Sequence, residues 1–207
     1  MRKFFRYFWA FIIGSFLGCL IEEIWCLIKS KKWQIRKSLI YLPLIPIYGI
    51  AGVLILGICS ILGNNKLAIF GIGFVIATLV EYISSFVQEK IFLTKSWDYS
   101  NIPFNLKGRV NLFYSIAFGL CAVLFIDYLK VVGDFIYMKM NMGGYIFSFI
   151  FMILFILDVF ISFFACYRQK KRRFGIKANN NFERYIDVKY DDKLLNKIYN
   201  NCIYIEK

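Results

Sequence analysis

The chain has 207 residues, of which 59% are hydrophobic, 20% aromatic and only 19% charged. A soluble domain of this size is nearer half apolar and a quarter charged, so the composition excludes an ordinary soluble globular protein. The sequence also lacks histidine, which excludes histidine-dependent catalytic triads and the usual zinc and haem sites.

Five apolar runs, each about as long as the hydrocarbon core of a bilayer, are predicted to form membrane-spanning helices. In chain order they cover about residues 8–28, 39–62, 67–88, 110–132 and 145–167. The second run begins with Pro43 and Pro46, which must loosen the first turns of its helix. We therefore predict an all-α membrane protein, a bundle of about five transmembrane helices, with residues 1–177 as its membrane domain.

The formal net charge is +13, and the basic residues lie in clusters beside the apolar runs. This pattern is typical of loops near anionic lipid headgroups, so we expect membrane lipids as partners and no nucleic acid. Fifteen Lys and Arg residues lie in loops 29–37 and 89–109 and in the segment 168–177, against six on the other side. Because cytoplasmic loops carry the excess of basic residues, we predict a multi-pass protein of the cell membrane with its N-terminus outside and its C-terminus in the cytoplasm.

Residues 178–207 form a polar tail that is rich in Asn and carries several acidic residues. Asp191 and Asp192 precede the segment 193–198, a pattern that predicts one short capped helix. We expect the tail as a whole to be a partly ordered cytoplasmic extension.

Carboxylates within the apolar runs are candidate site residues, because ionisable groups in a membrane usually face the protein interior. Glu22 follows Gly14 and Gly18 at steps of four, so it shares a helix face with a G-x-x-x-G packing stripe that points into the bundle. Glu23 lies further round the same helix and is expected to snorkel towards the lysines of the first loop. Glu81, on the third run, is predicted to lie at the same depth as Glu22.

Arg109 and Asn111 begin the fourth run at the same end of the bundle. We expect Arg109 to pair with Glu22 or Glu81. One interpretation is structural, with the ion pair fixing helix packing; the other makes this cluster the floor of a polar cavity open to the cytoplasm. Asp158, in the middle of the fifth run, has no obvious partner in the sequence.

The segment 95–109, between the third and fourth runs, mixes aromatic and hydrogen-bonding side chains with turn-forming residues. It is interpreted either as an ordinary interfacial loop, which suits Trp97 and Tyr99, or as a folded cap over the polar cluster. Tyr48, after the second proline, approaches from the same side. The complete candidate site is Glu22, Tyr48, Glu81, Trp97, Asp98, Tyr99, Asn105, Arg109 and Asn111.

Several uncommon motifs occur in order between about residues 10 and 125. They are 16–22, 43–49, 81–82, 89–90, 97–100, 104–105, 108–109 and Asn111. Together they resemble the ABC-transporter type IV family, also called CmpB-type ABC-transporter permeases. That family tends to have glycine before the first proline, where this chain has Leu42. The resemblance implies a multi-pass membrane protein with a role in transport.

Three functions remain open at this point. The first is a small permease component without a cofactor, which works with a separate ATPase subunit or as a homo-oligomer; the chain has no G-x-x-x-x-G-K-[ST] loop and is no ATPase itself. The second is a structural or regulatory membrane protein without turnover. The third is an enzyme acting on lipid or a lipid-linked headgroup, with Glu22, Glu81 or Asp98 as acid or base and Arg109 holding phosphate. The missing histidine weighs against an enzyme.

Overall fold

A computed structural model describes residues 1–31, 36–62 and 65–205, so residues 32–35 of the first basic loop lie outside the described residues. The elements are α1 (Arg2–Ser30), α2 (Pro46–Leu62), α3 (Lys66–Phe92), β1 (Thr94–Lys95), β2 (Asn105–Leu106), β3 (Val110–Asn111), α4 (Leu112–Lys139), α5 (Met142–Arg173), α6 (Asn181–Lys189), α7 (Asp192–Ile198) and β4 (Ile203–Tyr204). Helices α1, α3, α4 and α5 are long and apolar enough to cross a membrane, and α2 is a shorter apolar helix. The architecture is that of a helical membrane protein.

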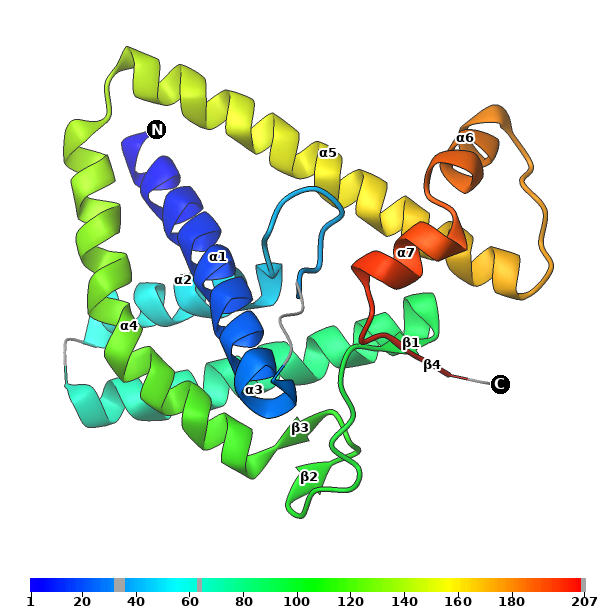
Figure 1. Ribbon diagram of the computed structural model, residues 1–207. Helices are drawn as coiled ribbons and strands as arrows, with labels where there is room; N and C mark the ends of the chain where they lie inside the picture. The colour runs from blue at the N-terminus through cyan, green and yellow to red at the C-terminus, as the bar shows by residue number, and fades with distance from the viewer. Residues whose placement is uncertain (32–35, 63–64, 206–207) are drawn as a thin grey trace.

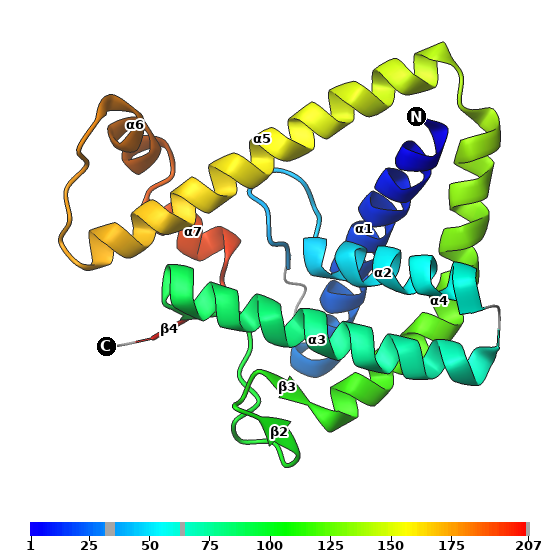
Figure 2. The ribbon, with the colours of Figure 1, turned by 180° about the vertical axis from the view of Figure 1, so that it is seen from behind.

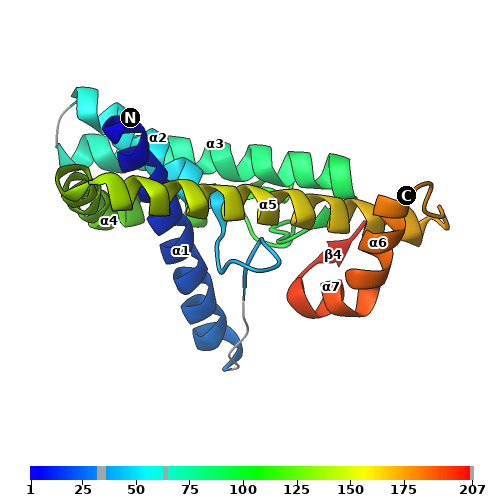
Figure 3. The ribbon, with the colours of Figure 1, turned by 90° about the horizontal axis from the view of Figure 1, so that it is seen from above.

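Helices α3, α4 and α5 outline a triangle, with α1 crossing inside it (Figure 1). From behind, α2 and α3 run side by side in front of α1 (Figure 2). Seen from above, α1 leaves the layer that contains α3 and α5 and projects to the side on which α6 and α7 also lie (Figure 3). Helices α1 to α4 thus form the bundle, and α5 borders it.

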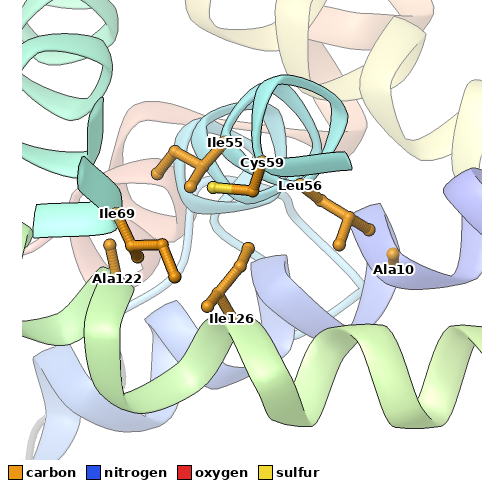
Figure 4. Close-up of a cluster of buried hydrophobic side chains, with 7 residues drawn as sticks. All are labelled: Ala10, Ile55, Leu56, Cys59, Ile69, Ala122 and Ile126. Carbon is orange, nitrogen blue, oxygen red and sulfur yellow. The ribbon is translucent and has the colours of Figure 1, made fainter. Parts of the chain in front are cut away.

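The core of the bundle is the place where α1, α2, α3 and α4 meet. Its buried side chains, drawn in Figure 4, are Ala10, Ile55, Leu56, Cys59, Ile69, Ala122 and Ile126. Small residues set the helix spacing beside this core: a Cβ on Gly14 of α1 would lie 3.4 Å from the Cα of Gly49 on α2. Such close backbone approach is how membrane helices pack when lipid removes the hydrophobic driving force between them.

Most helix starts follow from single polar residues. In each helix from α3 to α7, the side chain before the first turn accepts a hydrogen bond from a backbone amide of that turn, as expected of an N-cap. These capping residues are Asn65, Asn111, Asn141, Asn180 and Asp191.

The helix predicted over 39–62 begins later than the sequence pattern indicates, because residues 36–45 are not helical. Pro43 disfavours the helical conformation for Leu42, whereas Pro46 occupies the first helical position, where a missing amide hydrogen is tolerated. Helix α2 therefore has 17 residues, which is about 25 Å of helix against a hydrocarbon core of roughly 30 Å.

Helix α5 buries polar side chains and exposes apolar ones. Its buried residues are Ser148, Asp158, Ser162, Ala165, Arg168 and Gln169. Asp158 is 3% exposed and accepts hydrogen bonds from the backbone amides of Tyr41 at 3.1 Å and Leu42 at 2.7 Å. The partner that the sequence did not reveal is thus the backbone of the segment 36–45, whose amides would otherwise lack acceptors in a medium without water.

The tail is more ordered than the sequence predicts. Helix α7 confirms the short helix predicted after Asp191, but α6 and β4 are additional elements, and β4 pairs antiparallel with β1. Arg168 of α5, only 1% exposed, forms ion pairs with Glu183 at 3.3 Å and Asp187 at 2.6 Å in α6. The prediction of a partly ordered extension is therefore wrong for the described part of the tail, which packs against α5.

Candidate functional site

Three segments that are far apart in the sequence meet at one end of the molecule, which we call the loop end. They are the segment 36–45, the loop 93–111 and the tail. Strand β1 of the loop pairs with β4 of the tail, and the hydroxyl of Tyr199 in the tail donates to the carbonyl of Ser38 at 3.3 Å. The segments predicted to share one side of the membrane therefore lie together.

The first part of the site is a carboxylate–phenol pair between α1 and α2. The hydroxyl of Tyr48 donates a 2.7 Å hydrogen bond to the carboxylate of Glu22. The ring of Tyr48 lies against Gly18, and a Cβ at that position would overlap with it. Because Gly18 and Glu22 are four residues apart, they share one face of α1, so the predicted G-x-x-x-G stripe positions this pair.

The second part is a similar pair between α3 and the loop. The hydroxyl of Tyr99 donates to Oε1 of Glu81 at 3.0 Å, and its ring stacks on Tyr114 with 4.7 Å between centroids. Glu81 is 6% exposed, and among the described residues no group donates to its Oε2. Burial raises the pKa of Tyr99, and the charges of Glu81 and Glu22 raise it further, so this phenol stays protonated and remains a donor.

The two pairs adjoin through aromatic rings: Trp25, one turn beyond Glu22 on α1, lies 6.4 Å from Tyr114, the ring on which Tyr99 stacks. We call Glu22, Tyr48, Glu81 and Tyr99 the acid–tyrosine cluster. A guanidinium nitrogen of Arg36 lies 3.9 Å from Glu22, and both side chains are about 30% exposed. Sequence reasoning counted Arg36 only as a loop charge, since no helical spacing links a non-helical segment to a helix face.

Arg109 is not the cation of this cluster. Its guanidinium forms an ion pair with Glu89, near the end of α3, and donates to the hydroxyl of Tyr82 at 3.3 Å. The predicted pairing of Arg109 with Glu22 or Glu81 is wrong. Arg109 belongs to the loop that follows α3. Glu89 lies two turns beyond Glu81 and nearer to the end of α3 where this loop begins, so Arg109 reaches Glu89 first.

Asp98 shapes the loop rather than the cluster. It accepts hydrogen bonds from Lys95 at 2.8 Å and from the amide of Ser100 at 2.9 Å. These bonds lower the pKa of Asp98 to about 2, with the bond from Lys95 as the largest cause. Gly108 faces the same carboxylate with a φ of +68°, where a Cβ would be strained and crowded. Asp98 is therefore a fixed anion that holds the turn.

The other predicted loop residues also bind backbone. The side-chain nitrogens of Trp97, Asn105 and Asn111 each donate to a carbonyl group of the loop, at 2.8, 2.7 and 2.7 Å respectively. The structure thus brings Tyr99 of this loop into the cluster and uses its neighbours to keep the loop folded.

Glu23 differs from its prediction as well. It is buried, more so than Glu22, and the thiol of Cys19 lies 3.8 Å from its carboxylate. The expectation that Glu23 snorkels to the loop lysines is wrong, because this face of α1 turns towards the interior of the protein.

The donor set of the cluster limits what it can hold. Among the described residues, no three His, Cys, Asp or Glu side chains lie close enough to form a metal site. Both phenol hydroxyls already donate to carboxylates, and the guanidinium of Arg36 is beyond ordinary hydrogen-bond distance from Glu22. The cluster is therefore an acceptor-rich site of two carboxylates and two phenols just inside the loop end.

The comparison with known families agrees with this architecture. The family described as "Putative ABC-transporter type IV" matches residues 9–163. The match runs from α1 into α5 and so extends beyond the motifs between residues 10 and 125. No curated protein and no solved structure matches the chain.

Proposed function

Because this chain belongs to the ABC-transporter type IV family, we propose that it is a permease-like component of a transporter in the cell membrane. The acid–tyrosine cluster is its polar transport site, and the loop end faces the cytoplasm. The observation that carries this proposal is the pairing of two carboxylates with two phenols inside a bundle of apolar helices. Charged groups at such depth are costly and by default functional.

The partner in this proposal is a separate ATPase subunit, with a homo-oligomer as the second possibility. The chain carries no phosphate-binding loop of its own, so energy from ATP must come from another chain. Docking at the loop end is supported by the exposed side chains of Phe104 and Leu106 at the β2–β3 hairpin, because exposed apolar residues in a polar loop are typical of contact sites.

The experiment is capture of the full-length tagged protein from its native membranes after mild crosslinking. We expect an ATPase subunit to co-purify, and the charge reversal Lys107→Glu, at the exposed hairpin, to reduce its recovery severalfold. Lys139→Glu, an equally exposed lysine at the opposite end, is the matched control and should leave recovery unchanged. Recovery of the chain as a homo-oligomer without any ATPase would contradict the ATPase-coupled form of the proposal.

A structural or regulatory protein without turnover is the second candidate. It is favoured by the folded tail, whose acidic residues pair with Arg168 of α5. The lipid-modifying enzyme is disfavoured. Arg109, the expected phosphate ligand, is paired with Glu89, and the hydrogen bond from Lys95 lowers the pKa of Asp98, a candidate base, to about 2. In the capture experiment, a chain that yields only non-ATPase partners supports the regulatory function.

A further inference from the structure

We propose that the acid–tyrosine cluster binds an organic ammonium ion, held between the carboxylates of Glu22 and Glu81. This inference rests on the proposed function and names the class of substrate for that site. Its first support is charge, because the site holds two carboxylates, Glu22 and Glu81, each of which accepts a hydrogen bond from a tyrosine hydroxyl.

The second support is the unused acceptor of Glu81. This side chain is 94% buried, since its exposed fraction is 6%, and no described residue donates a hydrogen bond to Oε2. A buried carboxylate oxygen without a donor is unfavourable, because the hydrogen bonds that it made to water in the unfolded chain are not replaced. A ligand with an N–H group or a full positive charge removes that cost, so Oε2 of Glu81 is a free acceptor for a cationic ligand.

The surroundings favour an organic cation over a metal ion. A divalent metal prefers six or more oxygen ligands, whereas the cluster offers two carboxylates whose phenol neighbours are already donors. Aromatic rings pack against the two phenols instead: Tyr99 stacks on Tyr114, which meets Trp25 edge to face at 6.4 Å, and Tyr48 meets Phe118 at 6.3 Å. Carboxylates beside aromatic faces are the chemistry that recognises ammonium groups.

Arg36 is the internal competitor for this site. Its guanidinium stands 3.9 Å from Glu22, too far for a good hydrogen bond, and among the described residues its buried Nε has no partner. It belongs to the non-helical segment 36–45, which is held by Asp158. An incoming ammonium ion takes the place of this guanidinium at Glu22, so removing Arg36 should strengthen binding.

The ammonium group can belong to a free amine or to a lipid headgroup, and the test separates the two. The full-length protein is placed in nanodiscs of phosphatidylglycerol, which has no amine, and its unfolding temperature is measured against ethanolamine, choline or sodium chloride at constant ionic strength. We expect stabilisation by the two ammonium ions and none by sodium. The measurement is then repeated in nanodiscs that contain phosphatidylethanolamine. If the protein is more stable there without added amine, and added ethanolamine no longer raises the unfolding temperature, the lipid headgroup is the ligand.

Three variants tie the response to the cluster. Glu81→Gln keeps an acceptor for Tyr99 but removes one of two charges, so it should weaken apparent affinity at least about tenfold. Arg36→Gln should tighten it severalfold. Asp127→Asn, in an exposed ion pair with Lys66, is the control and should leave it unchanged. If Glu81→Gln does not fold, Glu22→Gln gives the same comparison.

Equal responses to sodium and ammonium, or an unchanged affinity in both carboxylate variants, would overturn the inference. These outcomes are independent of ATPase capture. A chain that recruits an ATPase but ignores ammonium keeps the proposed function and loses only this substrate class, whereas ammonium binding without an ATPase does the reverse.

Discussion

At the residue scale, the contact between Gly18 and Tyr48 determines whether Glu22 has its phenol partner. We predict that Gly18→Ala destabilises the protein by about 1–3 kcal/mol, because the added methyl group overlaps with the tyrosine ring and one of the helices must move. Thermal unfolding in nanodiscs measures the change. Gly71→Ala is the control, since nothing lies within 4 Å of a Cβ there, and it should be neutral or stabilising by roughly 0.5–1 kcal/mol. Equal effects at the two glycines would refute this packing account.

Sequence patterns identified Glu22 and Glu81 but not the groups that surround them. A carboxylate inside an apolar run is visible without a structure, because its insertion is costly wherever it points. Its partner depends on side-chain reach between helices that cross at unknown angles. In the sequence, Arg109 was the cation expected at the same depth as the two carboxylates. In the structure it pairs with Glu89, and Arg36 is the cation that lies near Glu22. A shift of two helical turns is beyond what spacing alone can resolve.

At the element scale, the segment 36–45 depends on α5. We predict that Asp158→Ala loosens this segment, because the amides of Tyr41 and Leu42 lose their acceptor and each unpaired buried group costs about 1–3 kcal/mol. Asp158→Asn retains one acceptor oxygen and should have a smaller effect. Hydrogen exchange of peptides covering residues 36–45 is the measurement, with peptides from the core of α4 as the internal control. Unchanged exchange in the alanine variant would show that the segment is held by other contacts.

The tail should respond to acid. Hydrogen bonding by the Asn179 amide and Lys171 lowers the pKa of Glu183; burial opposes a lowered pKa at Asp187, but bonds from Arg168 and Arg172 outweigh it. Depressed carboxylate pKa values give stability that is present above the unfolded values, about 4, and is lost as the pH falls through the folded values. We therefore expect the tail to become protease-sensitive as the pH falls below about 4.

A matched variant tests the cause of that release. Asp187→Asn removes a titrating partner of the buried Arg168, so its tail should already be more sensitive to protease at neutral pH and change less on acidification. Asp191→Asn is the control, because this side chain caps α7 and forms no ion pair with α5 among the described residues. If the tail were equally resistant to protease in both variants at every pH, the ion pairs with α5 would not be what keeps it folded against that helix.

Element types were predictable where one physical rule dominates. Long apolar runs predicted α1, α3, α4 and α5, because only a helix satisfies its own backbone in lipid. The rule fails over 39–45, where backbone amides are satisfied by Asp158 and the chain need not be helical. It fails again in the tail, whose helices are too short to be recognised as apolar runs. They are fixed by the buried side chains of Ile186 and Leu195 and by Arg168, which in sequence is only one residue of a basic run.

At the scale of the whole molecule, charge separates the two ends. The loops and tail that carry most of the basic residues meet at the loop end. At the opposite end, two of the six basic residues are neutralised, since Arg6 pairs with Asp134 at 2.6 Å and Lys66 with Asp127 at 2.5 Å. The positive-inside rule counts Lys and Arg rather than net charge, so the excess of fifteen basic residues against six in the sequence remains the ground for predicting that the loop end is cytoplasmic.

Orientation is testable by labelling single cysteines in a background from which the six native cysteines have been removed. We predict that Lys139→Cys reacts with a membrane-impermeant thiol reagent added to intact cells, because this exposed residue ends α4 at the end opposite the loops. Lys107→Cys in the loop and Lys193→Cys in the tail, both exposed, should react only after the membrane is opened. The two loop-end positions serve as mutual controls, since strand pairing between β1 and β4 requires them to share a side. Labelling of both from outside, with none at 139, would reverse the orientation, and an ATPase could then not reach the loop end from the cytoplasm.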